Sequence, residues 1–186
     1  MARVEPIPRD QMTAEQIRVN DIITAARYGG QARGPFAVWL RTPEFAELAG
    51  ELGLYLRTRT TLPRRLLELT VLVTARNWRA QYEWYAHAGF ADAAGLDPAV
   101  VEDLRLGRRP RFTADDEAVV YDVAREIDSG RRLTDATYQR AVELLGEQTV
   151  IDLLTIIGYY TMIAVLLVGL EVDTPDGSTP LPPTER

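Results

Sequence analysis

The sequence predicts an all-α protein built as a single domain, and three observations support this. Runs that alternate apolar and polar residues, typical of half-buried strands, are almost missing, whereas apolar residues at helical spacing recur along the chain. Residues that favour helix starts and stops stand at the borders of these runs. The 186 residues, 46% hydrophobic and 26% charged, suit one globular domain with a buried core.

The helix borders follow from their start and stop residues. Thr13 and Gln16 form a capping box, and Gly29-Gly30 stops the helix that they open. Pro63 suits the first turn of a segment whose apolar positions nearly encircle it, so that segment should be buried. We expect helices or helical turns over residues 13–28, 34–40, 42–55, 66–75, 80–94, 97–106, 113–127, 134–145 and 150–170, followed by a loose Pro- and Thr-rich tail.

Composition excludes several kinds of chemistry. The chain has no cysteine, which removes disulfides, thiolate nucleophiles, thiol peroxidase chemistry and cysteine metal ligands. It also has no lysine, so a lysine Schiff base is impossible, and its one histidine, His87, cannot form a two-histidine metal site within one chain. The formal charge of −6 gives little support to nucleic-acid binding.

The stretch Val150–Leu170 is long and apolar enough to span a bilayer. It contains Asp152 and Gly158, and acidic residues rather than arginines flank it. We interpret it as a helix buried in a domain or subunit interface. We therefore expect a cytoplasmic protein that binds no membrane and no nucleic acid and that assembles as a homo-oligomer.

Glu83 and His87 are four residues apart on a predicted helix, which places both on one face. A carboxylate beside an imidazole fixes its tautomer and makes it usable for proton transfer near neutral pH. From this pair alone, a helix-surface ion pair or a satisfied core histidine is the more frequent interpretation.

Glu68 strengthens the case for a chemical site, because it lies in an otherwise apolar run, where a carboxylate needs a partner or a raised pKa. On an unbroken helix it would lie roughly 22 Å from Glu83. The sequence therefore predicts a break between Arg76 and Ala80. If Glu68 and Glu83 both lie near His87, one carboxyl should stay protonated well above its solution value.

The spacing of Glu68, Ala80, Glu83 and His87 resembles the carboxymuconolactone decarboxylase and alkylhydroperoxidase D-like superfamily. Ala80 and Glu83 stand where its peroxidase branch has two cysteines, and residues 82–87 are similar to the Glu-Trp-x-x-His of its cysteine-less decarboxylase branch. Weaker likenesses extend the resemblance over residues 12–175, before a loose tail at 176–186. The resemblance implies an alkylhydroperoxidase D-like helical bundle, assembled as a trimer or hexamer and working without a cofactor.

Several side chains are candidates for substrate binding. Arg76, with Arg64 and Arg79 as weaker alternatives, can hold a substrate carboxylate, although surface solvation is the more frequent explanation of such arginines. The aromatic residues Trp78, Tyr82 and Trp84 can wall a pocket or can belong to the core or an interface. Tyr159 and Tyr160 interrupt an apolar helix and offer hydroxyl groups.

These residues predict a cofactor-free acid–base enzyme with Glu68, Glu83 and His87 as its catalytic set and no metal. The resemblance implies a small carboxylated lactone or related enolisable acid as substrate and a carboxy-lyase reaction. His87 would protonate the intermediate, Glu83 would orient and charge His87, and Glu68 would position a proton or water. The alternatives are an oligomeric protein that binds small acids without catalysis, and a Glu/His metal site completed by water or a second subunit.

Overall fold

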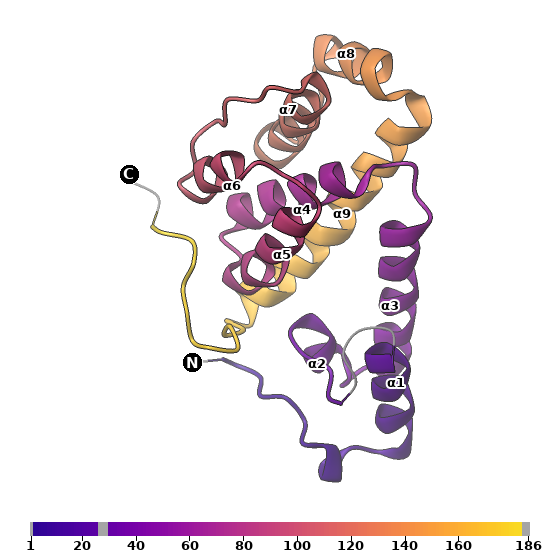
Figure 1. Cartoon of the computed structure of the whole chain (residues 1–186). Coiled ribbons are helices and arrows are strands. Elements are labelled where there is room, and N and C mark those ends of the chain that lie inside the picture. The colour runs from indigo at the N-terminus through magenta and orange to yellow at the C-terminus, as the bar shows by residue number, and fades with distance from the viewer. Residues whose placement is uncertain (1, 26–29, 184–186) are drawn as a thin grey trace.

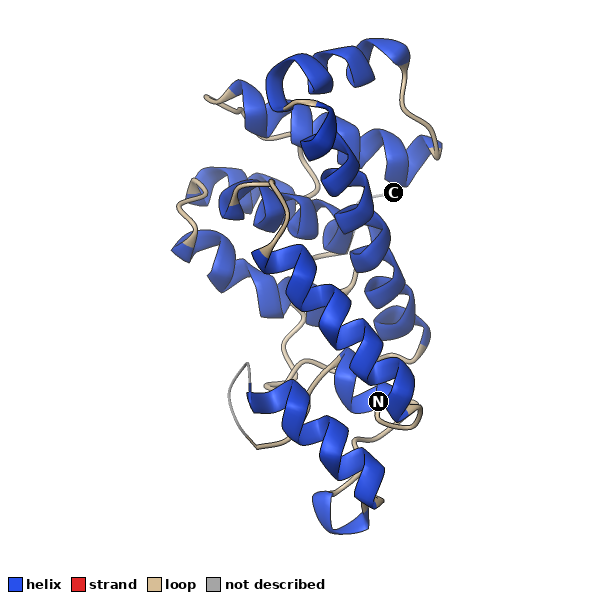
Figure 2. Ribbon diagram, turned by 90° about the vertical axis from the view of Figure 1, so that its right-hand side faces the viewer, coloured by secondary structure: helices blue, strands red, loops and turns tan. Residues whose placement is uncertain are grey.

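A computed structural model describes residues 2–25 and 30–183, and the regular structure in these ranges is entirely helical (Figures 1 and 2). The expected end of the first helix near Tyr28 lies outside the described residues. A short 3-10 turn, Arg9–Gln11, comes first. It precedes α1 (Ala14–Ala25), α2 (Pro35–Trp39), α3 (Pro43–Thr58), α4 (Arg64–Trp78), α5 (Gln81–Ala93), α6 (Pro98–Arg105), α7 (Asp115–Gly130), α8 (Asp135–Leu145) and α9 (Glu147–Gly169).

The helix borders show the expected capping chemistry. Thr13 and Gln16 exchange both hydrogen bonds of a capping box, at 2.9 and 3.3 Å. The side chains of Asp97 and Thr134 accept bonds from amides at the starts of α6 and α8. One expected stop is wrong, because α7 continues through Gly130 and ends at Arg131, which takes the left-handed conformation.

The predicted break between Arg76 and Ala80 is confirmed. α4 ends at Trp78, Arg79 adopts a left-handed backbone with φ 54°, and α5 begins at Gln81. The amide of Ala80 bonds back to the carbonyl of Ala75 at 2.8 Å, which satisfies the helix end as in a Schellman motif. The chain therefore reverses here, and α5 packs alongside α4.

The core is built around α4, which is buried from Leu66 to Arg76 and packs most extensively on α5, α7 and α9. Burying each leucine or valine of this helix contributes roughly 1.5–3 kcal/mol relative to leaving it exposed. α9 is long and apolar enough to cross a membrane by composition alone, but more than half of its most apolar stretch is buried within the protein. It serves here as the second core helix.

Helices α1, α2 and α3 stand to one side of this core (Figure 1). α1 packs on α3, while α2 and α3 reach the core through narrower contacts with α9. One of these contacts is specific, because the hydroxyl of Tyr159 donates to the carbonyl of Ala49 at 2.8 Å and lies against Gly53. This arrangement leaves space between the two groups of helices.

The C-terminal segment differs from the expected loose tail. Leu181 is buried in the core cluster. The Gln81 side chain accepts a hydrogen bond from the backbone amide of Leu181 at 2.9 Å and donates one to the backbone carbonyl of Leu181 at 3.0 Å. Arg105 donates to the carbonyl of Pro180 at 3.2 Å. Leucine between prolines gives no helical or strand periodicity, so the sequence does not reveal that this segment contributes a core side chain.

Candidate active site

A cavity of about 630 Å³ lies between α1–α3 on one side and α4, α5 and α9 on the other. Its volume falls in the range of small-molecule sites. Most of its lining is apolar or aromatic, and its polar groups come from several helices. They include Arg57 on α3, Arg64 on α4, Glu83 and His87 on α5, and the tyrosines Tyr82, Tyr159 and Tyr160.

Glu68 and His87 form the central pair of this site. Glu68 Oε2 lies 2.7 Å from Nδ1 of His87, and the Glu68 side chain is completely buried. The turn at Arg79 brings the two residues together across α4 and α5. The edges of the His87 ring pack on Tyr160 and Phe90, with ring centroids 5.1 and 5.8 Å apart. Packing and the hydrogen bond together fix the orientation of the imidazole.

The second oxygen of Glu68 is also engaged. Arg64 Nη2 lies 2.6 Å from Oε1, and the Arg64 guanidinium sits over the ring of Phe90 at 5.7 Å. A buried carboxylate needs such partners, because an uncompensated charge would be costly. Arg64 was one of the weaker candidates for substrate binding, and here it lines the cavity while compensating the charge of Glu68.

The bond to Glu68 determines what the imidazole presents to the cavity. Because a carboxylate can only accept, Nδ1 carries the proton that is donated to Glu68. The other nitrogen, Nε2, has no hydrogen-bond partner among the described residues. It is also not one of their fully buried, unpaired polar atoms, so it is accessible. His87 therefore offers Nε2 to the cavity, as an acceptor when the ring is neutral and as a donor when it is protonated.

Glu83 does not have the predicted role as the partner of His87. Both of its carboxyl oxygens are buried and make no hydrogen bond with the described residues, although Glu83 belongs to the cavity lining. Burial, and secondarily the charge of Asp128, raises the pKa of Glu83 well above its usual value. The expectation of a protonated carboxyl rested on Glu68 and Glu83 both lying beside His87, whereas burial is the main cause of the raised pKa of Glu83. The i, i+4 spacing places Glu83 near His87 but does not bring their polar atoms together.

We predict that Glu83→Gln stabilises the protein in a pH-dependent way. The folded-state pKa of Glu83 exceeds the unfolded value of about 4.5. Below pH 4.5 the carboxyl is neutral in both states, so its ionisation does not change the free energy of unfolding. At higher pH the unfolded chain ionises, and the free energy of unfolding falls by up to about 1.4 kcal/mol per pH unit until the folded-state pKa is reached. Urea unfolding at pH 4, 6 and 8 should show a gain that grows with pH.

The exposed Glu143→Gln is the control for this prediction and should show no such trend. A Glu83→Gln variant that is equally or less stable than the native protein at pH 8 would contradict a neutral, buried Glu83.

Three of the four predicted substrate-binding residues lie away from the cavity. Arg76 is buried at the end of α4 against Gly107, and it bonds the carbonyl of Pro182 at 3.4 Å. Burial and three neighbouring arginines lower its pKa. Trp84 belongs to the core and Trp78 is half-buried beside the turn, whereas Tyr82 lines the cavity as predicted.

Tyr159 and Tyr160 both reach the cavity, as their positions suggested. Tyr159 bonds Ala49, and burial raises the pKa of Tyr160 above its usual value, which keeps that hydroxyl protonated. Sequence reasoning missed Arg57 and Phe90. Arg57 closes an amphipathic helix, where an arginine has the same pattern as any surface arginine, so only the packing of α3 on α9 reveals it.

The geometry gives no support to a metal site. Among residues 2–25 and 30–183, no three His, Asp or Glu side chains are arranged to hold a metal ion. The glutamate oxygens nearest to His87 are already engaged by Arg64 and by the imidazole itself.

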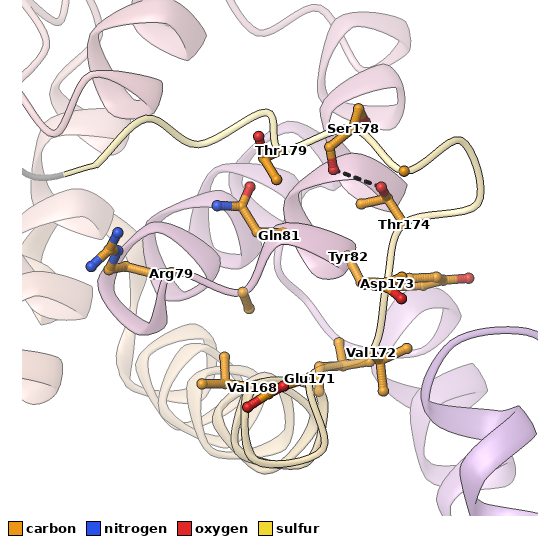
Figure 3. A pocket seen from close by; sticks show the side chains of 13 residues that line it. Arg79, Gln81, Tyr82, Val168, Glu171, Val172, Asp173, Thr174, Ser178 and Thr179 are labelled. Atoms are coloured by element: carbon orange, nitrogen blue, oxygen red, sulfur yellow. Dashed lines mark hydrogen bonds between the residues drawn. The ribbon is translucent and has the colours of Figure 1, made fainter. Parts of the chain in front are cut away.

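A second, smaller cavity of about 250 Å³ lies where the start of α5, the end of α9 and the C-terminal segment meet (Figure 3). Several of its polar groups already have partners. Thr174 donates to the carbonyl of Ser178 at 2.6 Å, Glu171 pairs with Arg3, and Asp173 accepts from the amide of Ala2. It contains no imidazole or unpaired buried carboxyl, so the larger cavity is the candidate active site.

Comparisons with known proteins establish the fold. The structure is similar to that of an uncharacterised peroxidase-related protein from Silicibacter sp. TM1040, with a TM-score of 0.74 and 14% sequence identity over 92% of this chain and 90% of the other. The predicted all-α, alkylhydroperoxidase D-like fold is thereby confirmed. The sequence matches no protein-family model and no curated protein. At this identity the likeness concerns the fold alone.

Proposed function

We propose that this protein is a cofactor-free acid–base enzyme of the cysteine-less, carboxymuconolactone decarboxylase-like type. Its substrate would be a carboxylated lactone or a related enolisable acid. The observation that carries the proposal is the hydrogen bond that Nδ1 of the only histidine donates to buried Glu68, which leaves Nε2 facing a cavity of substrate size. A carboxylate that fixes the imidazole tautomer is the arrangement that general acid–base catalysis requires.

The reaction would use these groups as follows. When carbon dioxide leaves, the electrons of the broken carbon–carbon bond pass into the unsaturated lactone and form a dienolate. Protonated His87 donates its Nε2 proton to a carbon of the dienolate and becomes neutral, then regains a proton from water. Glu68 orients the ring and stabilises its charged form. Burial raises the pKa of Glu83, which disfavours a negative charge there that would repel an acidic substrate.

The lining of the cavity also changes which arginines are proposed to bind the substrate. Arg76 lies outside the cavity, whereas Arg57 and Arg64 line it. A guanidinium can hold a carboxylate through two parallel hydrogen bonds, so these two residues replace Arg76 as candidates. The peroxidase-related name of the structural neighbour is not carried over, because thiol peroxidase chemistry needs a cysteine and this chain has none.

A screen of lactones and β-keto acids for release of carbon dioxide tests the proposal. Turnover of at least one compound is expected, and it should be absent in a His87→Asn preparation run in parallel. A non-catalytic protein that binds small acids would bind such compounds in both preparations and turn over none. That outcome would favour the alternative function over the one proposed.

We also propose that the chain assembles with copies of itself. The large side chains Phe45, Leu48, Leu52 and Tyr55 form a stripe at helical spacing on α3, and each is 41–58% exposed. An apolar stripe of this kind marks an interaction surface. Light scattering at micromolar concentration should therefore give a mass of at least two chains.

Leu48→Glu combined with Leu52→Glu should shift the protein to a monomer, because it places charges in the middle of the stripe. Leu144→Glu on α8 is a matched control, since Leu144 is similarly exposed but lies on another helix. A native protein that is monomeric at micromolar concentration would contradict the assembly.

A further inference from the structure

The cavity is larger and more apolar than a small carboxylated lactone needs. Its volume of about 630 Å³ lies in the middle of the range for sites that enclose drug-sized ligands. The Glu68–His87 pair lies on the α4 and α5 side, and the remaining space extends toward α1 and α3. A compact lactone placed against His87 would leave that part of the cavity without a ligand.

The cavity is also lined by large apolar side chains that are only half covered. Ile22 and Leu54 are each 47% exposed, and Phe90 is 38% exposed. They come from α1, α3 and α5, so the fold gathers them in one cavity from three different helices. A ligand with an apolar body would remove this surface from water, and that is a favourable contribution to binding.

The same cavity contains cations without carboxylate partners. Arg33 and Arg57 line it and form no ion pair with the described residues, whereas Arg64 is engaged by Glu68. Arg57 is half-buried close to Tyr160. Among the acidic residues of the lining, Glu47 is already paired with Arg18 and burial raises the pKa of Glu83, which leaves exposed Glu51 as the opposing charge.

We propose that the ligand of this cavity is an amphipathic organic acid. Its carboxylate binds Arg57, and an apolar body of about eight carbons or more lies against Ile22, Leu54 and Phe90. The amphipathic acid specifies the substrate class of the proposed function. It rests on that function in one respect, which is that the same ligand must reach His87. The small lactone of the resemblance is then replaced by an acid that carries a substantial apolar group.

Isothermal titration calorimetry with butanoate, octanoate and 1-octanol separates the two parts of the recognition. Each buried methylene is worth a factor of about four in affinity, so octanoate should bind more tightly than butanoate by on the order of 100-fold if all four extra methylenes are buried. Octanoate should also bind at least tenfold more tightly than 1-octanol, which has the same chain without the charge.

Arg57→Gln should remove the advantage of octanoate over 1-octanol and leave 1-octanol binding unchanged. Arg59→Gln is the matched control, because Arg59 is two residues away at the end of the same helix and does not line the cavity. If Arg57→Gln is poorly folded, Leu54→Ser provides the second variant, and it should weaken octanoate and 1-octanol to the same degree.

The proposal is overturned if octanoate does not bind, if butanoate binds as tightly as octanoate, or if Arg57→Gln and Arg59→Gln behave alike. Its failure can be told apart from failure of the proposed function. His87→Asn should retain octanoate binding. A native protein that binds octanoate but turns over no lactone or β-keto acid would refute the acid–base reaction alone. Turnover of a small lactone without octanoate binding would refute the amphipathic ligand alone.

Discussion

Turnover should fall by a factor of about 10²–10⁴ in His87→Asn, because the substitution removes the group that transfers the proton. Glu68→Gln should lose activity mainly in kcat, since an amide can also donate to Nδ1 and no longer selects the tautomer that leaves Nε2 open. Both substitutions preserve approximate shape. The helical content and the assembly of both variants should therefore match those of the native protein, as measured by circular dichroism and light scattering.

Glu51→Gln is the control for this pair of variants, because Glu51 lines the same cavity but is exposed and makes no contact with His87. It should retain activity within a few-fold. Native turnover in both His87→Asn and Glu68→Gln would refute the proposed site. Failure of both to fold would instead show that the residues are structural.

The free energy of unfolding should fall by about 3 kcal/mol or more in Gly34→Ala, for two reasons that add. Gly34 has φ 57° and ψ −131°, a conformation in which a side chain is strained by about 1–3 kcal/mol. A Cβ at this position would also clash with the ring of Tyr82, and overpacking costs a further 1–3 kcal/mol or so. Urea unfolding measures the loss.

Gly146→Ala separates the two contributions. Gly146 has φ 82° and ψ 153°, and a Cβ there would meet no atom within 4 Å, so only the backbone strain applies. Gly34→Ala should be the more damaging, and Tyr82→Ala in the same chain should recover part of the difference. Equal losses at the two glycines would mean that the contact between α2 and α5 is not tight.

Local sequence signals were sufficient for most of the fold. Capping residues such as Thr13 and Thr134 form short-range hydrogen bonds, so their effect is readable without knowledge of the rest of the chain. The break after α4 was predicted from a different kind of argument. A buried carboxylate at Glu68 needed a partner, and an unbroken helix would have kept Glu83 and His87 out of its reach.

The pairing within the site was harder to predict. Glu83 and His87 share a helix and Glu68 does not, so spacing favoured the wrong glutamate as the partner of His87. The actual choice depends on how α5 packs on α4, which decides which side chain points at the imidazole. Helical spacing limits the residues that can approach each other, but it does not fix the direction of a polar atom.

The residues proposed to bind the substrate depend on contacts between distant parts of the chain. Arg76 follows a buried run close to the candidate catalytic residues in sequence, yet it points toward the C-terminal segment. Arg57 lies in a helix with no special pattern and reaches the cavity because α3 crosses α9 at Gly53. Local helical periodicity does not reveal where either arginine side chain lies.

Nitrogen-15 NMR of the imidazole tests the central claim most directly, because His87 is the only histidine and gives one pair of ring signals. The account predicts that the neutral ring carries its proton on Nδ1, bonded to Glu68, with Nε2 unprotonated, and that Glu68→Gln abolishes this preference. A proton on Nε2 in the native protein, or a tautomer that does not change in Glu68→Gln, would contradict the proposed acid–base centre.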